Sequence, residues 1–444
     1  MFNYTAARWL WNEDEQLARR RVHFDIEGLM QVAAQVLGAT TCVEIVKLPE
    51  GNFNKTFLLT MDDGKQAIAR LPNPNAGRPH FSTASEVATM DFVRIFHDDL
   101  PTPENSDLPS HLYTDGDAVP RSDGRFAVGP SNGRMYFDDG LSEVEIVRGP
   151  SGLHSQVFNF STASGNILRG QQYQPTAEKK INVLHNYIKM APYMLPKDEN
   201  LHASVMWHND LHTDNIFVDP ADPVKIVGII DWQSTHLSPL FLQACTPAML
   251  KFEGPIPESF EINLPDNFDA LDPADQENAK KLRSMQSLYT LYEVACFKTT
   301  EPAYRAIRTR NTLGPQTTGL ARSLFSDGEP FVHALLVSAV DKWAPLVRGT
   351  PHEGTPCCLE FSCEARKLHV AELEKWQRSV ELMDMFLLEV GAYGGWDGFV
   401  NHGEYEVLRT KLHDVRERFV LRLQREEGED GFEKQHAVFP FPEV

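Results

Sequence analysis

A stretch near the middle of the chain gathers the residue types that chemistry on phosphates requires. Residues 204–235 read SVMWHNDLHTDNIFVDPADPVKIVGIIDWQST. The polar side chains of interest are those of His208, Asp210, His212, Asn215 and Asp231. Carboxylate and amide oxygens are hard donors, which suit Mg²⁺ held jointly with substrate phosphates. A carboxylate that does not touch the metal can orient or deprotonate an attacking hydroxyl. The composition of this stretch is therefore typical of a phosphoryl-transfer site.

The two halves of this stretch are expected to fold back on each other. Two apolar runs, 216–218 and 226–230, are separated by a segment rich in Pro and Asp. β-Branched residues favour strands, whereas Pro and Asp favour a turn, so the pattern predicts a β-hairpin. A hairpin places its two outer ends side by side. We therefore expect Asp210, Asn215 and Asp231 to converge around one divalent ion.

The order of these residues resembles a known signature. His-x-Asp-Leu-His-x-x-Asn, beginning at His208, and the later Ile-Asp-Trp are similar to the motifs of aminoglycoside phosphotransferase-like kinases, the small-molecule branch of the protein-kinase-like fold. The resemblance implies ATP and Mg²⁺ as cofactors, Asp210 as the catalytic base, and Asn215 and Asp231 as metal ligands. It implies that His208 supports the loop, while His212 either packs or contacts the acceptor. A solvated loop beside a structural hairpin is the alternative interpretation.

Three strand-like segments earlier in the chain are expected to cover the nucleotide. They span residues 42–48, 55–61 and 66–71. Backbone N–H groups of the loop after the first segment can face phosphate oxygens, so Gly51, Asn52 and Asn54 are candidate nucleotide-binding residues. An ordinary hairpin loop is the alternative, since one glycine is a weak signal.

The third strand and the helix after it supply a candidate ion pair. Arg70 stands where kinases place a phosphate-binding Lys, and a guanidinium can bind phosphate through two N–H groups. A helix expected over 82–97 carries Glu86 in its first half. We expect Glu86 to pair with Arg70, although a Glu in a first turn also suits the helix dipole.

Several phrases resemble one fungal branch of this family, related to altered inheritance of mitochondria protein 9. They lie at residues 2–10, 48–55, 70–77 and 84–91. The resemblance implies mitochondrial residence. In the family two further strands and an adenine-binding hinge follow the helix, but here Phe96 leads into a polar, turn-rich segment. Either the hinge is lost or the gene is mis-spliced or mis-predicted. The alternative function is therefore a mitochondrial kinase-like pseudoenzyme or scaffold without catalysis.

Composition narrows the possible partners. Lys and Arg number 42 against 62 Asp and Glu, a formal net charge of −20, which argues against nucleic acid as a partner. A nucleotide and a small molecule are the expected partners, and the sequence does not predict an oligomeric state or the phosphate acceptor. Six cysteines without regular spacing favour a reducing compartment, which is the cytoplasm if the mitochondrial resemblance does not hold. No run of residues is long and apolar enough to predict a transmembrane helix.

The patterns together predict an α+β fold with two lobes. Residues 1–97 form a small, truncated amino-terminal lobe with an antiparallel sheet, and residues 1–24 of it look like an amphipathic helix. Residues 98–176 are expected to be irregular and rich in loops. Residues 177–444 form a larger, mainly helical lobe that carries the catalytic loop at 206–233. Its helices are expected near 177–192, 275–299, 329–343, 362–390 and 402–426.

Overall fold

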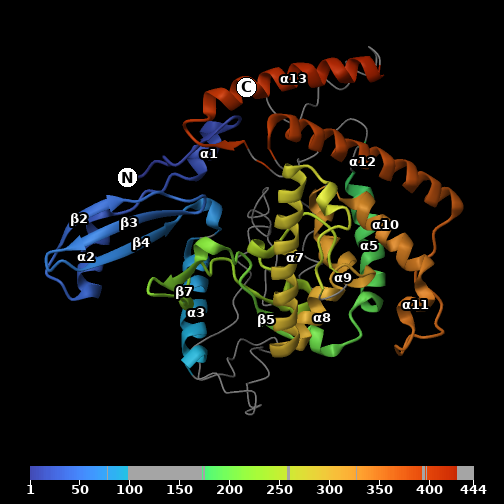
Figure 1. The fold of residues 1–444 in the computed structure, drawn as a ribbon, viewed down its shortest axis with the longest axis horizontal. Coiled ribbons are helices and arrows are strands. Elements are labelled where there is room, and N and C mark those ends of the chain that lie inside the picture. The colour runs from blue at the N-terminus through green and yellow to red at the C-terminus, as the bar shows by residue number, and fades with distance from the viewer. Residues whose placement is uncertain are drawn as a thin grey trace.

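The computed structural model describes residues 1–77, 79–98, 173, 176–257, 261–326, 328–392, 396 and 398–427. Within these ranges the fold is α+β, as predicted. A small antiparallel sheet lies at one end of the molecule and a larger, mainly helical part at the other (Figure 1). Most of the loop-rich segment expected at 98–176 lies outside the described residues.

The sheet has the antiparallel strand order β2–β3–β4. Its strands are β2 (Cys42–Lys47), β3 (Asn54–Met61) and β4 (Gln66–Pro72). Side chains of β3 alternate between the two faces, so Phe57 and Leu59 are buried against helix α2 (Ile26–Leu37). The Asp25 carboxylate caps this helix by accepting a hydrogen bond from the Gly28 N–H at 3.0 Å. The strands match the predicted ones to within one residue at each end.

Helix α3 (Pro79–Asp98) lies beside β4 and carries Glu86. It begins three residues before the predicted start. A short 3-10 helix, η1 (Pro74–Ala76), joins it to the strand, and the Ser82 hydroxyl donates to the Ala76 carbonyl at 2.8 Å. These contacts fix the helix against the edge of the sheet that carries Arg70.

The amino-terminal segment reaches across to the carboxy-terminal helices. Strand β1 (Arg8–Trp9) pairs with β9 (Phe399–Val400), and helix α1 (Glu13–Arg19) follows it. Figure 1 shows α1 close to the start of the last helix, α13 (Tyr405–Glu427). The amphipathic helix expected over residues 1–24 therefore forms only at α1. The residues before it are extended because they complete a two-stranded sheet.

The helical part contains two principal cores. Its helices are α5 (Ala177–Met194), α6 (Leu240–Gln243), α7 (Pro273–Thr299), α8 (Glu301–Thr309), α9 (Leu313–Leu320), α10 (Glu329–Asp341), α11 (Trp343–Val347), α12 (Cys363–Val390) and α13. One core lies between α5 and α10, and the other joins α12 to α13. The helix expected at 329–343 is divided into α10 and α11 at Lys342. Within the described ranges no helix is long and apolar enough to cross a bilayer.

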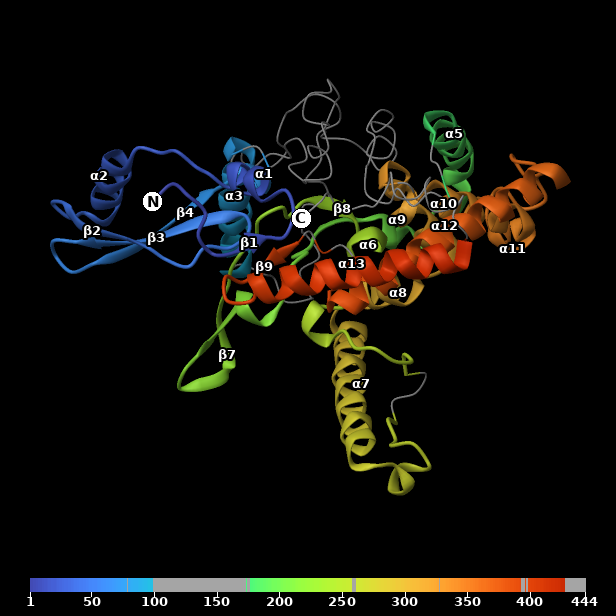
Figure 2. The ribbon, with the colours of Figure 1, turned by 90° about the horizontal axis from the view of Figure 1, so that it is seen from above.

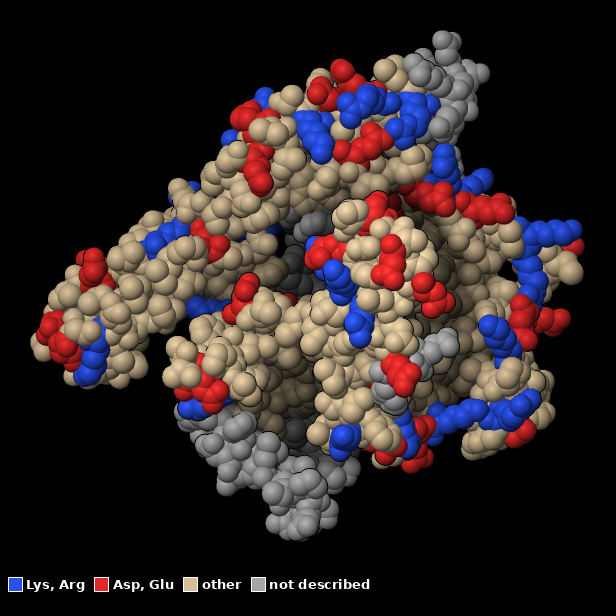
Figure 3. All heavy atoms as spheres, viewed as in Figure 1, with Lys and Arg blue, Asp and Glu red and all other residues tan. Residues whose placement is uncertain are grey.

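Charged side chains of both signs are mixed over the face shown in Figure 3, without a continuous basic patch. This distribution agrees with the net charge of −20.

Candidate functional site

The central hairpin consists of β6 (Ile216–Asp219) and β7 (Asp222–Ile229). Asp219 pairs with Asp222, so the turn is tighter than the Pro- and Asp-rich segment suggested, and Pro223 lies within β7. At the other end Ile216 pairs with Ile229. Figure 2 shows β7 projecting from the body of the molecule. The outer end of the hairpin, by contrast, lies against the loop that carries the predicted catalytic residues.

Hydrogen bonds bring the three predicted oxygen donors to that outer end. The Ile230 N–H donates to the Asn215 carbonyl at 3.0 Å, which sets Asp231 beside the start of β6. The Asn215 side-chain Nδ2 donates to the Asp210 carbonyl at 2.9 Å. Asn215 thus links the Asp210 backbone to Ile230, the residue that precedes Asp231. The Asp210 carboxylate is 70% exposed and faces solvent.

Two contacts of Nδ2 orient the amide of Asn215, a residue that is 5% exposed. Besides the Asp210 carbonyl, its Nδ2 lies 3.1 Å from the His212 Nε2, which acts as the acceptor. Both amide hydrogens are therefore used by protein acceptors, and Oδ1 is directed away from them. The His212 Nδ1 lies 3.9 Å from the Asp214 carboxylate. This arrangement shows His212 orienting Asn215 and does not test whether it also contacts an acceptor.

Asp231 has a left-handed backbone conformation, with φ at 63°. For a residue other than glycine this conformation costs on the order of 1 kcal/mol, so neighbouring contacts must hold it. The His208 Nε2–H donates to the Ile230 carbonyl at 2.9 Å, and the Trp232 Nε1–H donates to the Ile229 carbonyl at 3.0 Å. The two rings also contact each other edge to face, with centroids 4.7 Å apart. His208 therefore supports the segment that presents Asp231.

Arg70 joins the sheet to the hairpin. Its Nη1 donates to Glu86 Oε1 at 2.9 Å, so the expected ion pair is present. Its Nη2 donates to Asp231 Oδ1 at 2.8 Å, a contact that the sequence did not predict. No local signal could reveal it, because it depends on how the sheet sits over the hairpin. One guanidinium can bind two carboxylates in this way because its N–H groups point in fixed directions.

The three charges influence each other's protonation. Burial works against the charge of Arg70, but its hydrogen bond to Asp231 and the charge of Glu86 outweigh burial and raise its pKa. Burial raises the pKa of Glu86, and the nearby Asp231 carboxylate adds to this effect while Arg70 opposes it. Two carboxylates near one cation leave an excess of negative charge. Such a site is suited to a further cation.

The donor set fits magnesium. Within the described ranges no group of three or more His, Cys, Asp or Glu residues is placed to hold a metal by itself. Magnesium in nucleotide sites usually binds one or two protein oxygens, and phosphates and water complete its octahedron. Asn215 Oδ1 and Asp231 Oδ2, the oxygen that does not bond Arg70, match this requirement in type and number.

The loop between β2 and β3 reaches the same region. Gly51 and Asn52 are exposed, and the Asn52 carbonyl accepts a hydrogen bond from Asn73 at 2.9 Å. Asn54 is buried, and its Nδ2 donates to the Gln233 side chain at 2.8 Å. The side chain of Asn54 is therefore turned toward the segment just after Asp231. The predicted backbone contacts to phosphate stay a prediction.

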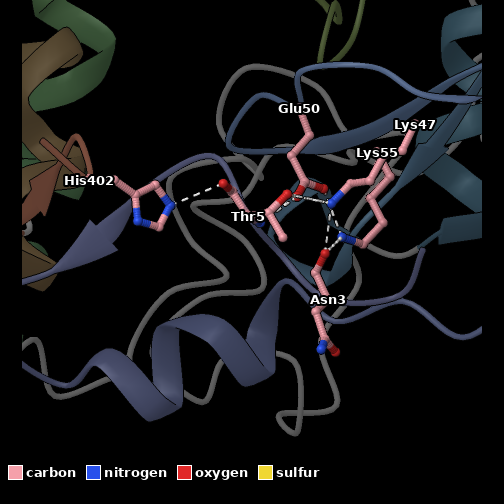
Figure 4. A network of polar contacts seen from close by, with 6 residues as sticks. All are labelled: Asn3, Thr5, Lys47, Glu50, Lys55 and His402. Carbon is pink, nitrogen blue, oxygen red and sulfur yellow. Dashed lines mark hydrogen bonds and ion pairs between the residues drawn. The ribbon is translucent and has the colours of Figure 1, made fainter.

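A second polar cluster beside this loop was missed from the sequence. Its members are Asn3, Thr5, Lys47, Glu50, Lys55 and His402 (Figure 4). Glu50 and Lys55 pair at 2.7 Å with side chains only 1% exposed. The one available signal was Lys55, a charged residue at a position of β3 that packs against other parts of the protein.

Comparison with known proteins shows which family this part of the chain resembles. Residues 148–242 match the model of the phosphotransferase enzyme family, a segment that contains the loop at 206–233. Two subtelomeric hrmA-associated cluster proteins from strains of Aspergillus fumigatus are each 27% identical, over 77% of this chain and 86% of their own length. Altered inheritance of mitochondria protein 9 of Yarrowia lipolytica is 36% identical, but over only 21% of this chain and 18% of its own.

A solved structure, that of macrolide 2'-phosphotransferase type I, aligns with 71% of this chain and 97% of its own, at 15% sequence identity. The TM-score of this alignment is 0.26. The family match confirms the resemblance inferred from the His-x-Asp and Ile-Asp-Trp motifs. Residues 148–242, which contain both motifs, are therefore similar to the phosphotransferase enzyme family.

Proposed function

We propose that this protein is an ATP- and Mg²⁺-dependent phosphotransferase that acts on a hydroxyl or amine of a small molecule. The observation that carries the proposal is the position of Arg70 between Glu86 and Asp231, at 2.9 and 2.8 Å. A strand cation, a helix carboxylate and a carboxylate at the end of a hairpin are the parts that kinases assemble around the nucleotide phosphates.

Each residue has a distinct part in this proposal. Asp210 accepts the proton of the acceptor hydroxyl. The acceptor can reach the Asp210 carboxylate because this side chain is exposed. Asn215 and Asp231 hold magnesium, which supplies positive charge to the phosphate oxygens. Arg70 donates to the same phosphates, and Glu86 keeps its guanidinium in place. The exposed backbone of Gly51 and Asn52 supplies further N–H donors to the phosphates.

The location and the acceptor follow less directly. The partial likeness to altered inheritance of mitochondria protein 9 supports mitochondrial residence. The net charge of −20 suits a cationic acceptor, because a negative field raises the local concentration of cations. A protein acceptor is not favoured, because the motif has the Ile-Asp-Trp form rather than the Asp-Phe-Gly of protein kinases.

A thermal-shift titration with MgATP tests the proposal. Asp231→Asn removes the metal-binding charge while Asn still tolerates the left-handed backbone at this position. Asp222→Asn, at the far turn of the same hairpin, is the matched control. We expect MgATP to stabilise the wild type and Asp222→Asn by about 2.7 kcal/mol at a concentration 100 times the dissociation constant, and to leave Asp231→Asn unchanged.

A flat response in all three proteins would show that the chain does not bind MgATP. That result would support the alternative, a kinase-like pseudoenzyme or scaffold without catalysis. An equal rise in all three would show that nucleotide binds elsewhere and that Asp231 is not a metal ligand.

A further inference from the structure

The loop between β2 and β3, which belongs to the proposed nucleotide site, contains a buried carboxylate that is bonded to residues outside the loop. Glu50, inside this loop, accepts hydrogen bonds from Lys55 Nζ at 2.7 Å and Lys47 Nζ at 2.6 Å. It also accepts one from the Thr5 N–H at 2.7 Å. Figure 4 shows these groups meeting at a single point between the two strands and the amino-terminal segment.

The amino-terminal segment is fixed to both lysines. The Asn3 carbonyl accepts from Lys47 Nζ at 2.8 Å and from Lys55 Nζ at 3.0 Å. Lys47 also donates to the Thr5 hydroxyl at 2.8 Å. Residues 3–5 therefore form hydrogen bonds with side chains of both β2 and β3, the strands that flank the loop.

The same segment is bonded to the carboxy-terminal part of the chain. The His402 Nε2–H donates to the Thr5 carbonyl at 3.1 Å. A few residues later, β1 pairs with β9, and the Arg8 guanidinium stacks over the Tyr405 ring with its Cζ 3.5 Å from the centroid. A continuous path of contacts thus runs from the loop through residues 3–9 to the start of α13.

The cluster is costly to bury, which calls for a reason beyond general stability. An ion pair taken out of water often stabilises a fold no more than an apolar pair of similar size. Here the pKa of Glu50 is lowered, because the two ammonium groups and the Thr5 N–H outweigh the effect of burial. The carboxylate is therefore charged, and its four hydrogen bonds define one position for the loop.

We infer that Glu50 is a positioning residue that sets the loop at 48–53 for nucleotide binding by fixing it to residues 3–5 and, through them, to the carboxy-terminal helices. The inference rests on the proposed function. It assigns the amino-terminal segment a part in the nucleotide site. A variant that breaks the bond between Glu50 and Thr5 should therefore weaken nucleotide binding by more than its loss of thermal stability explains.

Two variants separate positioning from stability. Glu50→Leu with Lys55→Met replaces the buried ion pair by an apolar pair, which we expect to keep the fold while it removes the bonds from Glu50 to Thr5 and Lys47. Lys55→Met alone leaves Glu50 bonded to Lys47 and Thr5. Glu15→Gln, which breaks an exposed ion pair on α1, is the control. Each full-length protein is titrated with MgATP by calorimetry, and its thermal midpoint is measured without nucleotide.

We expect the double variant to bind MgATP about ten-fold more weakly than wild type, which corresponds to the loss of one well-placed contact. Glu15→Gln should stay within two-fold of wild type, and Lys55→Met, which keeps the bonds from Thr5 and Lys47 to Glu50, should weaken binding less than the double variant does. If the double variant does not fold, Glu50→Gln takes its place and should also weaken binding, because a neutral amide binds the two ammonium groups less strongly.

The outcomes distinguish the inference from the function on which it rests. If wild type binds and the double variant binds equally well, the positioning role is wrong and the proposed function stands. If MgATP affinity decreases in Lys55→Met and in the double variant in proportion to the decrease in their thermal midpoints, the cluster has only a structural role. The inference is then also wrong. If wild type itself shows no binding, the proposed function fails and the inference falls with it.

Discussion

Replacing Arg70 by Met and Asp231 by Ala, singly and together, isolates the contact that joins the sheet to the hairpin. The two groups lie 2.8 Å apart, and their side chains are 32% and 33% exposed. A shielded hydrogen bond between charged groups contributes about 1.5–3 kcal/mol, and an exposed ion pair contributes about 0.2–1 kcal/mol. Because this pair is partly exposed, we expect a coupling free energy of about 1 kcal/mol.

The double-mutant cycle removes the side effects of each substitution. Met at position 70 also loses the contact with Glu86, and Ala at position 231 adds backbone strain, but each effect occurs with and without the other substitution. The free energy of unfolding of the four proteins is measured in urea, without nucleotide, by tryptophan fluorescence. The exposed Arg19–Glu15 pair on α1 is a matched control with an expected coupling of about 0.3–0.5 kcal/mol.

Salt provides a second check on the same cycle. Raising the ionic strength from 0.1 to 1 M shortens the screening length from about 10 to about 3 Å, so the coupling should decrease. A coupling below about 0.3 kcal/mol at low salt would be within the error of additivity. That result would refute the contact, and with it the placement of the strand cation at the end of the hairpin.

Two further predictions concern other parts of the chain. Burial lowers the pKa of His333 from its usual 6.5 to about 4, and the His369 ring lies 4.1 Å away. The folded state therefore binds fewer protons than the unfolded state, so the stability that neutral His333 contributes is fully present above about pH 6.5 and is lost as the pH falls toward 4. Urea midpoints measured across this range should fall less for His333→Phe than for wild type. Gly51→Ala should change the free energy of unfolding by between zero and about +1 kcal/mol in the stabilising direction, because its φ is not positive and an added Cβ meets no atom within 4 Å; a loss above about 1 kcal/mol in urea would contradict this.

Local sequence patterns predict the helices and strands but not how these elements pack against each other. The strands of the sheet and the boundaries of α5 and α12 follow from alternation, helical periodicity and capping residues, which act over a few positions. The bonds of Asn215 to Asp210 and to Ile230 follow from the geometry of a hairpin, because both ends belong to one short segment; the metal site expected there stays a prediction.

Contacts between distant segments had no such signal. The β1–β9 pairing joins strands of two residues each, too short for any periodicity, across almost the whole chain. The bond from Arg70 to Asp231 joins residues 161 positions apart and depends on how the sheet is placed over the hairpin. Lys55 looked like an ordinary strand residue, and its burial depends on the bonds to Glu50 and to the Asn3 carbonyl.

Calorimetric titration of MgATP into wild type and Asp231→Asn, with and without magnesium, tests the site most directly. The geometry around Arg70, Asn215 and Asp231 predicts binding of one nucleotide per chain that weakens strongly without magnesium and is lost in the variant. Binding of equal strength in both proteins, or binding that does not depend on magnesium, would contradict the assignment of this hairpin end as the metal–nucleotide site.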